Sequence, residues 1–127
     1  MTINYVVKPR KNINDPYAPQ RYYAMAKARG DVNLKQLGKE ITQRSTVNHA
    51  DTLAVLESLT QLLGEHIMAG DIVRLGDLGD FRITLSSAGT ATAEEFTSAQ
   101  IEKARIRFRP GQDLREVLQN LTYKKEK

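Results

Sequence analysis

Apolar residues follow two different periods along the chain. In three stretches they recur every three or four positions, which indicates helices, and in several shorter stretches they alternate with polar residues, which indicates strands. Residues 22–26 fit either pattern, and their pair of tyrosines favours a strand. We therefore expect helices beginning after Asn33, Asn48 and Pro110, and strands over residues 3–7, 22–26, 73–75, 81–85 and 104–109.

The helix ends carry suitable capping residues. Asn33 and Asn48 fit the N-cap position, where a side-chain oxygen accepts a backbone N–H of the first turn. Gly70 fits the residue just beyond a helix end, which often adopts a left-handed conformation. Between Asn48 and Gly70 the apolar positions cover more than one helix face. We interpret this wide stripe as burial on two sides, against the chain's own sheet and against a partner.

Two segments are expected to lack regular structure. The first strand should end at Pro9, because proline cannot donate to a strand ladder, and residues 10–20 read as a loop. The tail over residues 124–127 is expected to fray.

Composition excludes several classes of protein. The chain has 127 residues, 40% of them hydrophobic and 27% charged, which is typical of one globular domain. Cysteine is absent, and no apolar run is long enough for a membrane span or a secretory signal. His49 and His66 are too far apart to share a metal, and no nucleophile–base pair or phosphate-binding loop is evident. We expect a soluble, cytoplasmic protein that is not an enzyme and has no cofactor, metal or small-molecule substrate.

Charge is distributed unevenly along the chain. The net charge is +4, with a pI near 9.4. Residues 1–33 hold six Lys or Arg against two acids, and residues 101–127 hold eight against four, whereas residues 71–100 hold two against five. The basic ends suit a polyanionic partner, and the middle of the chain does not.

Two motifs resemble those of the bacterial HU and integration host factor family. The first is the segment from Gly70 to Phe81, GDIVRLGDLGDF, and the second runs from Arg107 to Arg115, RFRPGQDLR. The resemblance implies an α+β, IHF-like DNA-binding fold with two N-terminal helices, a three-stranded antiparallel sheet with an arm, and a C-terminal helix. It also implies an intertwined homodimer that binds double-stranded DNA, in which arm prolines kink the duplex, the mechanism the family is known for.

Two sets of residues are the candidate site. The strand arginines would lie about 6–7 Å apart on one face, near the spacing of phosphates along a DNA strand. The predicted DNA contacts are Arg74, Gly79, Arg82, Arg105, Arg107 and Arg109, together with Lys8, Arg10 and Lys11 from the N-terminal segment. The predicted dimer core consists of Leu56, Leu59, Leu63, Leu78, Phe81 and Phe108.

The sequence departs from the family at the arm. Residues 86–96 contain no proline, lysine or arginine, and Glu94 and Glu95 would be repelled by phosphates. Asp80 stands where the family usually has Asn. The segment 1–33 is absent from standard members and is similar to the N-terminal part of HU-like proteins of the Bacteroidetes type.

From these features we predict a histone-like, nucleoid-associated protein that binds DNA with little sequence specificity and bends it weakly. The domains would be an N-terminal β extension over 1–33, an HU-like domain over 34–122 and a basic tail over 123–127. The alternative is that the HU-like core serves only as a dimerisation scaffold for binding another protein, which the acidic segment 71–100 favours.

Overall fold

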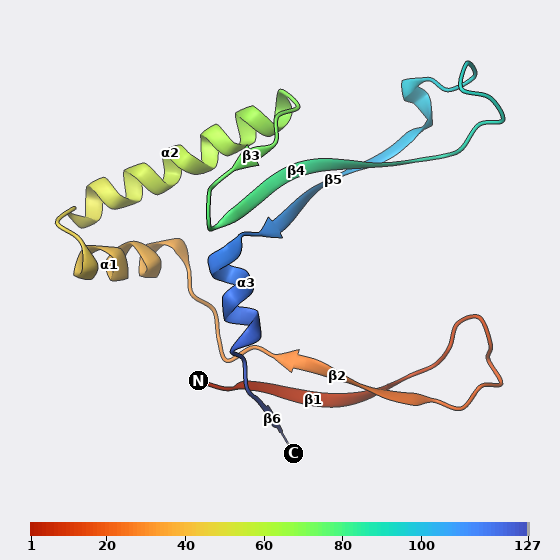
Figure 1. Cartoon of the computed structure of the whole chain (residues 1–127), viewed down its shortest axis with the longest axis horizontal. Coiled ribbons are helices and arrows are strands. Elements are labelled where there is room, and N and C mark those ends of the chain that lie inside the picture. The colour runs from red at the N-terminus through yellow and green to blue at the C-terminus, as the bar shows by residue number, and fades with distance from the viewer. Residues whose placement is uncertain (127) are drawn as a thin grey trace. The chain divides into compact units, whose positions relative to one another are not determined.

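The computed structural model describes residues 1–126 and divides the chain into two compact units. The terminal unit comprises residues 1–33 and the segment from Val117 onward, and the central unit comprises Leu34–Glu116. Figure 1 shows the elements. They are β1 (Ile3–Arg10), β2 (Arg21–Lys27), α1 (Leu34–Arg44), α2 (His49–Met68), β3 (Val73–Arg74), β4 (Gly79–Ser87), the short 3-10 helix η1 (Ser98–Gln100), β5 (Ile101–Pro110), α3 (Gln112–Gln119) and β6 (Tyr123–Lys125).

The terminal unit is a three-stranded sheet in the order β2-β1-β6. The first two strands form an antiparallel hairpin, and β6 runs parallel to β1, pairing residues 3–5 with residues 123–125. The strand does not end at Pro9 as predicted but continues to Arg10. One edge of β1 pairs with β6, but only at the first residues of β1. Beside Pro9, this edge has no neighbouring strand among the described residues. A strand edge without a neighbour tolerates a proline.

The predicted fraying of the tail is wrong for residues 124–126. The Glu126 N–H donates to the Tyr5 carbonyl, and its carboxylate pairs with Lys27 at 2.6 Å and accepts from Asn4 at 3.3 Å. The hydrogen bond from Lys27 is the main reason that the pKa of Glu126 lies below its ordinary value. These long-range contacts hold the end of the chain on the sheet, and residue 127 lies outside the described residues.

The central unit begins with a helix pair. Gly38 of α1 is buried against α2, because a Cβ there would lie 3.0 Å from Leu53 Cδ2. The predicted N-cap of α2 is confirmed, since Asn48 Oδ1 accepts the Asp51 N–H at 2.8 Å. The predicted helix end is also confirmed: Gly70 has φ +91°, and the N–H groups of Gly70 and Asp71 donate back to Ile67 and His66. This pattern is the Schellman motif.

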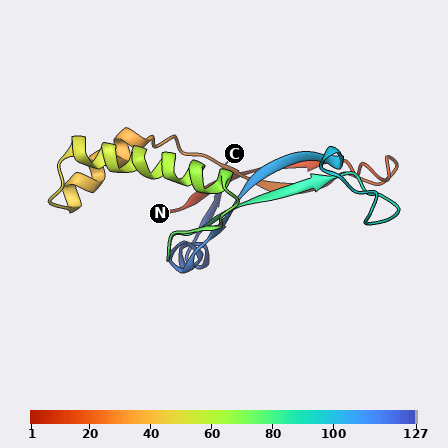
Figure 2. The same cartoon turned by 90° about the horizontal axis from the view of Figure 1, so that it is seen from above.

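The sheet of the central unit has the order β3-β4-β5 and is antiparallel throughout, as predicted. The strands β4 and β5 form a long ribbon that extends away from the α1–α2 pair, which Figure 2 shows from above. A bulge between Ser86 and Ser87 marks the outer end of the ribbon. Residues 88–100 connect the two strands and include η1, which Thr97 and Gln100 close with a capping box.

The junction of sheet and α3 explains why glycine occupies two motif positions. Gly79 has φ +145°, and a Cβ there would overlap the Arg109 carbonyl oxygen and lie 2.7 Å from the Phe108 ring. Gly111 lies against the Asp77 carbonyl, and its N–H donates to Leu78 at 2.9 Å. The turn before β4 and the start of α3 can therefore approach closely only without side chains at these two positions.

A Gly79→Ala substitution is expected to destabilise the central unit strongly. The new methyl group would meet backbone and an aromatic ring in a backbone conformation that alanine disfavours, so the free energy of unfolding should fall by about 3 kcal/mol. The melting temperature, measured by circular dichroism, should drop by roughly 10–20 °C. Gly89→Ala is the matched control, because nothing lies within 4 Å of a Cβ at Gly89. Equal melting temperatures for Gly79→Ala and wild type would contradict the proposed packing role.

Very few apolar side chains are buried. Ile67 is the single buried hydrophobic residue among the described residues. Phe81 and Phe108 contact each other across β4 and β5, with ring centroids 4.9 Å apart, yet Phe108 remains 41% exposed. Most of the stripe along α2 is uncovered, including Val55 at 64% and Met68 at 90% exposure. The expectation that the helix stripe is covered on one side by the chain's own sheet is therefore met only near Ile67.

Candidate nucleic-acid interface

The register of β4 and β5 separates basic from apolar side chains. Successive residues of a strand point to opposite faces, and directly paired residues share a face. Pairing of Phe81 with Phe108 and of Ile83 with Ile106 defines an apolar face. The opposite face, which we call the basic face, contains the pairs Arg74–Asp80, Asp80–Arg109, Arg82–Arg107, Thr84–Arg105 and Ser86–Lys103.

Six of the side chains on the basic face are cationic and one is anionic. Asp80 accepts from Arg74 at 3.0 Å and lies 4.0 Å from Arg82. Among the described residues, no carboxylate lies within ion-pair distance of Arg105, Arg107 or Arg109, and all three are exposed. The face therefore presents a row of guanidinium groups that the chain itself does not neutralise.

One cross-strand pair on this face is unfavourable in isolation. Arg82 and Arg107 lie directly opposite each other. Like charges at such positions repel and destabilise a sheet. Asp80 offsets part of this repulsion from the Arg82 side, and an external anion would offset the rest. The arrangement can accept a row of phosphates, each bound by charge-assisted hydrogen bonds from a guanidinium.

The acidic residues of segment 71–100 do not form one patch on the basic face. Asp71 pairs with His66 at 2.8 Å at the end of α2, and Asp77 lies in the turn before β4. Glu94 and Glu95 lie in the loop beyond the outer end of the ribbon. Only Asp80 shares the basic face, so the negative charge counted in the sequence is spread over separate places.

The predicted contacts are distributed over both units. Arg74, Arg82, Arg105, Arg107 and Arg109 share the basic face, whereas Lys8, Arg10 and Lys11 belong to the terminal unit. Lys103 continues the row and was missing from the predicted set, although its alternation with Arg105 gave the signal. Gly79, the first residue of β4, is buried beneath Phe108, and its role in DNA contact stays a prediction.

The predicted dimer-core residues are uncovered to different degrees. Leu56, Leu63 and Phe81 are half-buried. The other three are exposed, namely Leu59 at 39%, Phe108 at 41% and Leu78 at 48%. These apolar side chains are incompletely buried within the single chain, so a partner could cover them.

Two other kinds of site are absent within the described residues. No cluster of three or more His, Cys, Asp or Glu side chains could hold a metal ion within residues 1–126. No helix in that range is sufficiently long and apolar to cross a membrane.

Comparison with known proteins identifies the family of the chain. Residues 1–125 match the family profile described as HU-HIG, an HU domain fused to wHTH, Ig, or glycine-rich motif. The chain belongs to the HU-HIG family. The resemblance of the two motifs to HU is thereby confirmed, and the family match includes the segment 1–33. A search of the curated proteins found no match.

One similar solved structure supports the fold of this HU-HIG chain. It is the crystal structure of a protein from Bacteroides vulgatus described as a "putative bacterial DNA binding protein". The two superpose with a TM-score of 0.66 at 13% sequence identity, over 98% of this chain. This chain spans 47% of the length of that protein, about half.

Proposed function

We propose that the chain is a histone-like, nucleoid-associated protein that binds double-stranded DNA without marked sequence preference. The observation that carries the proposal is the basic face of β4 and β5, with six cationic side chains and a single carboxylate. Phosphate neutralisation by such a row releases counterions and does not depend on base sequence. In this role the protein catalyses no reaction and needs no cofactor.

Weak bending of DNA follows from the loop at the end of the ribbon. Residues 88–100 contain no proline, lysine or arginine. Glu94 and Glu95, both exposed, adjoin Phe96, so phosphates would repel the loop from the groove that a wedge must enter. The ribbon would lie along the backbone, and the kink made by arm prolines is not expected.

We also propose that the protein acts as a homodimer. The chain exposes 11175 Å², whereas a folded monomer of 14.3 kDa exposes about 6,800 Å². An interface between two domains of one chain hides only about 600–1,500 Å², so no docking of the two units accounts for the excess. An obligate dimer interface buries about 2,000–5,000 Å² in total, or about 1,000–2,500 Å² on each chain, so a second copy would cover a large part of the excess.

A salt series with duplex DNA tests the DNA proposal. Fluorescence anisotropy of the full chain with two duplexes of unrelated sequence should give similar affinities at low salt. The logarithm of the association constant should fall linearly with the logarithm of salt concentration, by about 0.9 for each phosphate contact. Undetectable binding at low salt, or an affinity that is independent of salt, would contradict the proposal.

The second candidate is a dimerisation scaffold that binds another protein. The acidic loop at the end of the ribbon favours it, because this loop replaces a basic DNA-binding arm. The two candidates differ in the salt series, since a scaffold would not bind either duplex. The basic face makes DNA binding the better supported of the two.

A further inference from the structure

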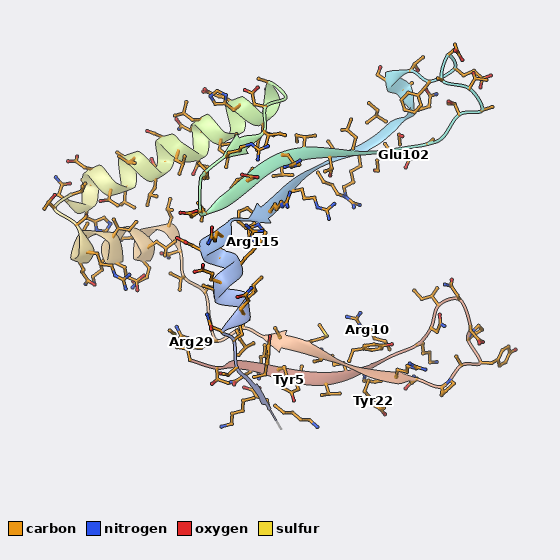
Figure 3. The ribbon with its side chains drawn as sticks, in the orientation of Figure 1. Tyr5, Arg10, Tyr22, Arg29, Glu102 and Arg115 are labelled. Carbon is orange, nitrogen blue, oxygen red and sulfur yellow. The ribbon has the colours of Figure 1, made fainter. Side chains whose placement is uncertain are left out.

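The terminal sheet also carries a group of cations on one face of a hairpin. Its register places Tyr5, Val7 and Tyr22 on one face, and Lys8, Arg10 and Arg21 on the other. Figure 3 shows Arg10 on one side of the hairpin, with Tyr5 and Tyr22 on the opposite side. The face that holds Arg10 is therefore cationic toward the loop of the hairpin, whereas Val6 and Met25 are paired farther along it.

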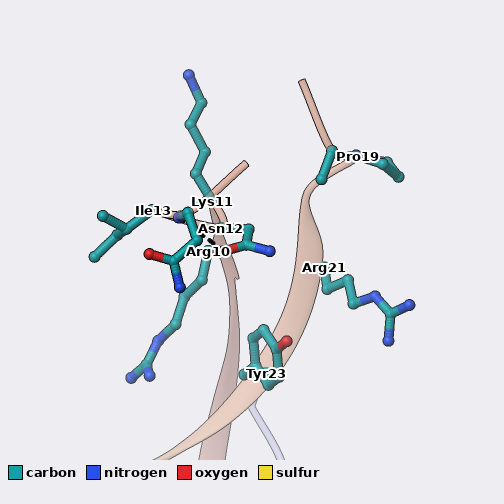
Figure 4. A pocket seen from close by; sticks show the side chains of 9 residues that line it. Arg10, Lys11, Asn12, Ile13, Pro19, Arg21 and Tyr23 are labelled. Atoms are coloured by element: carbon teal, nitrogen blue, oxygen red, sulfur yellow. Dashed lines mark hydrogen bonds between the residues drawn. The ribbon is translucent and has the colours of Figure 1, made fainter. Parts of the chain in front are cut away.

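Two arginines are paired across the strands at the loop end of this hairpin. Arg10 and Arg21 are directly paired across the strands, which places like charges opposite each other. Arg10 Cζ lies 5.8 Å from the centre of the Tyr23 ring. A cation–π contact of this kind holds a guanidinium in place and leaves its N–H donors available. Figure 4 shows the two arginine side chains extending on either side of Tyr23.

A hollow lies between these side chains and the loop. It has a volume of about 770 Å³ and is lined by residues that include Arg10, Lys11, Asn12, Arg21 and Tyr23, with no acidic residue in its lining. Within residues 1–126, no carboxylate is ion-paired with Arg10, Lys11 or Arg21. Arginine, lysine and asparagine side chains all carry donors suited to phosphate oxygens.

Asp15, the acidic residue of the loop, is hydrogen-bonded within the loop. The Asp15 carboxylate accepts the Tyr17 backbone N–H at 3.1 Å and so stabilises the turn. Lys8 extends the group of cations along β1 beyond the hollow, and farther along the same face lie Val6, Met25 and the ion pair of Lys27 with Glu126. Cations that extend from the hollow to Lys8 suit neighbouring phosphates of one chain better than one small anion.

We propose that this hollow, the hairpin-tip site, binds a phosphodiester of nucleic acid. Arg10 and Arg21 hold the phosphate oxygens between them, Lys11 and Asn12 add donors from the loop, and Tyr23 is a positioning residue that fixes Arg10. Binding would relieve the repulsion between the two arginines. The proposal rests on the DNA-binding function above and adds a second contact, separate from the basic face of the central unit.

The test compares Arg10→Gln/Arg21→Gln in the full chain with wild type, using a labelled duplex across a salt series. Affinity at low salt should fall by about tenfold or more, and the salt slope should shrink by about 0.9, the value for one phosphate contact. The loss should also appear when Arg105→Gln and Arg107→Gln are already present. Arg29→Gln removes a cation of the same unit that lies outside the hollow. It should lower affinity less than Arg10→Gln alone or Arg21→Gln alone.

Two further variants separate positioning from folding. Tyr23→Phe keeps the ring and should retain wild-type affinity, whereas Tyr23→Leu should lower affinity, with both variants melting near the wild-type temperature. Wild-type binding that depends on Arg105 and Arg107 but not on Arg10 and Arg21 would overturn this inference and leave the proposed function intact. The assignment to nucleic acid would be overturned if the wild-type chain bound anionic phospholipid vesicles but not the duplex, and if Arg10→Gln/Arg21→Gln lost the vesicle binding.

Discussion

Replacing Arg105 and Arg107 with glutamine is expected to weaken duplex binding by roughly a hundredfold at low salt, because removing one charge-assisted hydrogen bond to a phosphate lowers affinity by about tenfold. The salt slope should shrink by at least about 1.8. Neither side chain has a carboxylate partner among the described residues, and Arg107 lies opposite Arg82. The melting temperature should therefore stay the same or rise, because the substitution removes a repulsion.

This combination of weaker binding and undiminished stability distinguishes a binding surface from a structural one. Lys35→Gln/Lys39→Gln removes the same charge from α1, outside the sheet, and is the matched control. It should lower affinity far less than the pair on β5. Equal losses of affinity for the two double variants would mean that only net charge matters and would contradict a specific role for the basic face.

Leu59→Glu is expected to convert a dimer into monomers. Leu59 is already 39% exposed in the single chain, so the substitution costs little within one subunit. In a dimer it would bury an unpaired carboxylate in each subunit, which costs several kcal/mol, so the dissociation constant should rise by at least about a hundredfold. Sedimentation velocity at micromolar concentration should give twice 14.3 kDa for wild type and 14.3 kDa for the variant.

Gln61→Glu is the control for Leu59→Glu, because it adds the same charge at an exposed polar position two residues away. It should leave the dimer intact. A wild-type chain that sediments as a stable, folded monomer would refute the proposed dimer, and the exposed apolar surface would then need another partner.

Much of the fold could be predicted because its local signals agree with one another. Asn48, Gly70 and the apolar period between them determine α2 through interactions within a few residues of each other. The alternation of Arg105, Arg107 and Arg109 with apolar residues correctly predicted a strand with two unlike faces. The glycines of the motifs were recognised by resemblance, and the structure supplies the reason: Phe108 and the Asp77 carbonyl occupy the space that side chains would need.

Features that depend on distant parts of the chain could not be predicted. Residues 123–125 have no apolar alternation, and they form a strand only because β1 offers a free edge and Glu126 pairs with Lys27. The hairpin-tip site likewise requires the register that places Arg21 opposite Arg10, which no local pattern specifies. The composition of segment 71–100 suggested an acidic surface, but it could not show that Asp80 is the single acid on the basic face.

The most direct test of DNA binding by the basic face is to follow arginine side-chain Nε–H resonances by NMR while a short duplex is added. The predicted result is that Arg82, Arg105 and Arg107 shift or broaden as the duplex is added and recover when salt is raised. Arg44 of α1 should remain unchanged. Perturbation of Arg44 while the arginines of β4 and β5 stay unaffected would contradict the proposal.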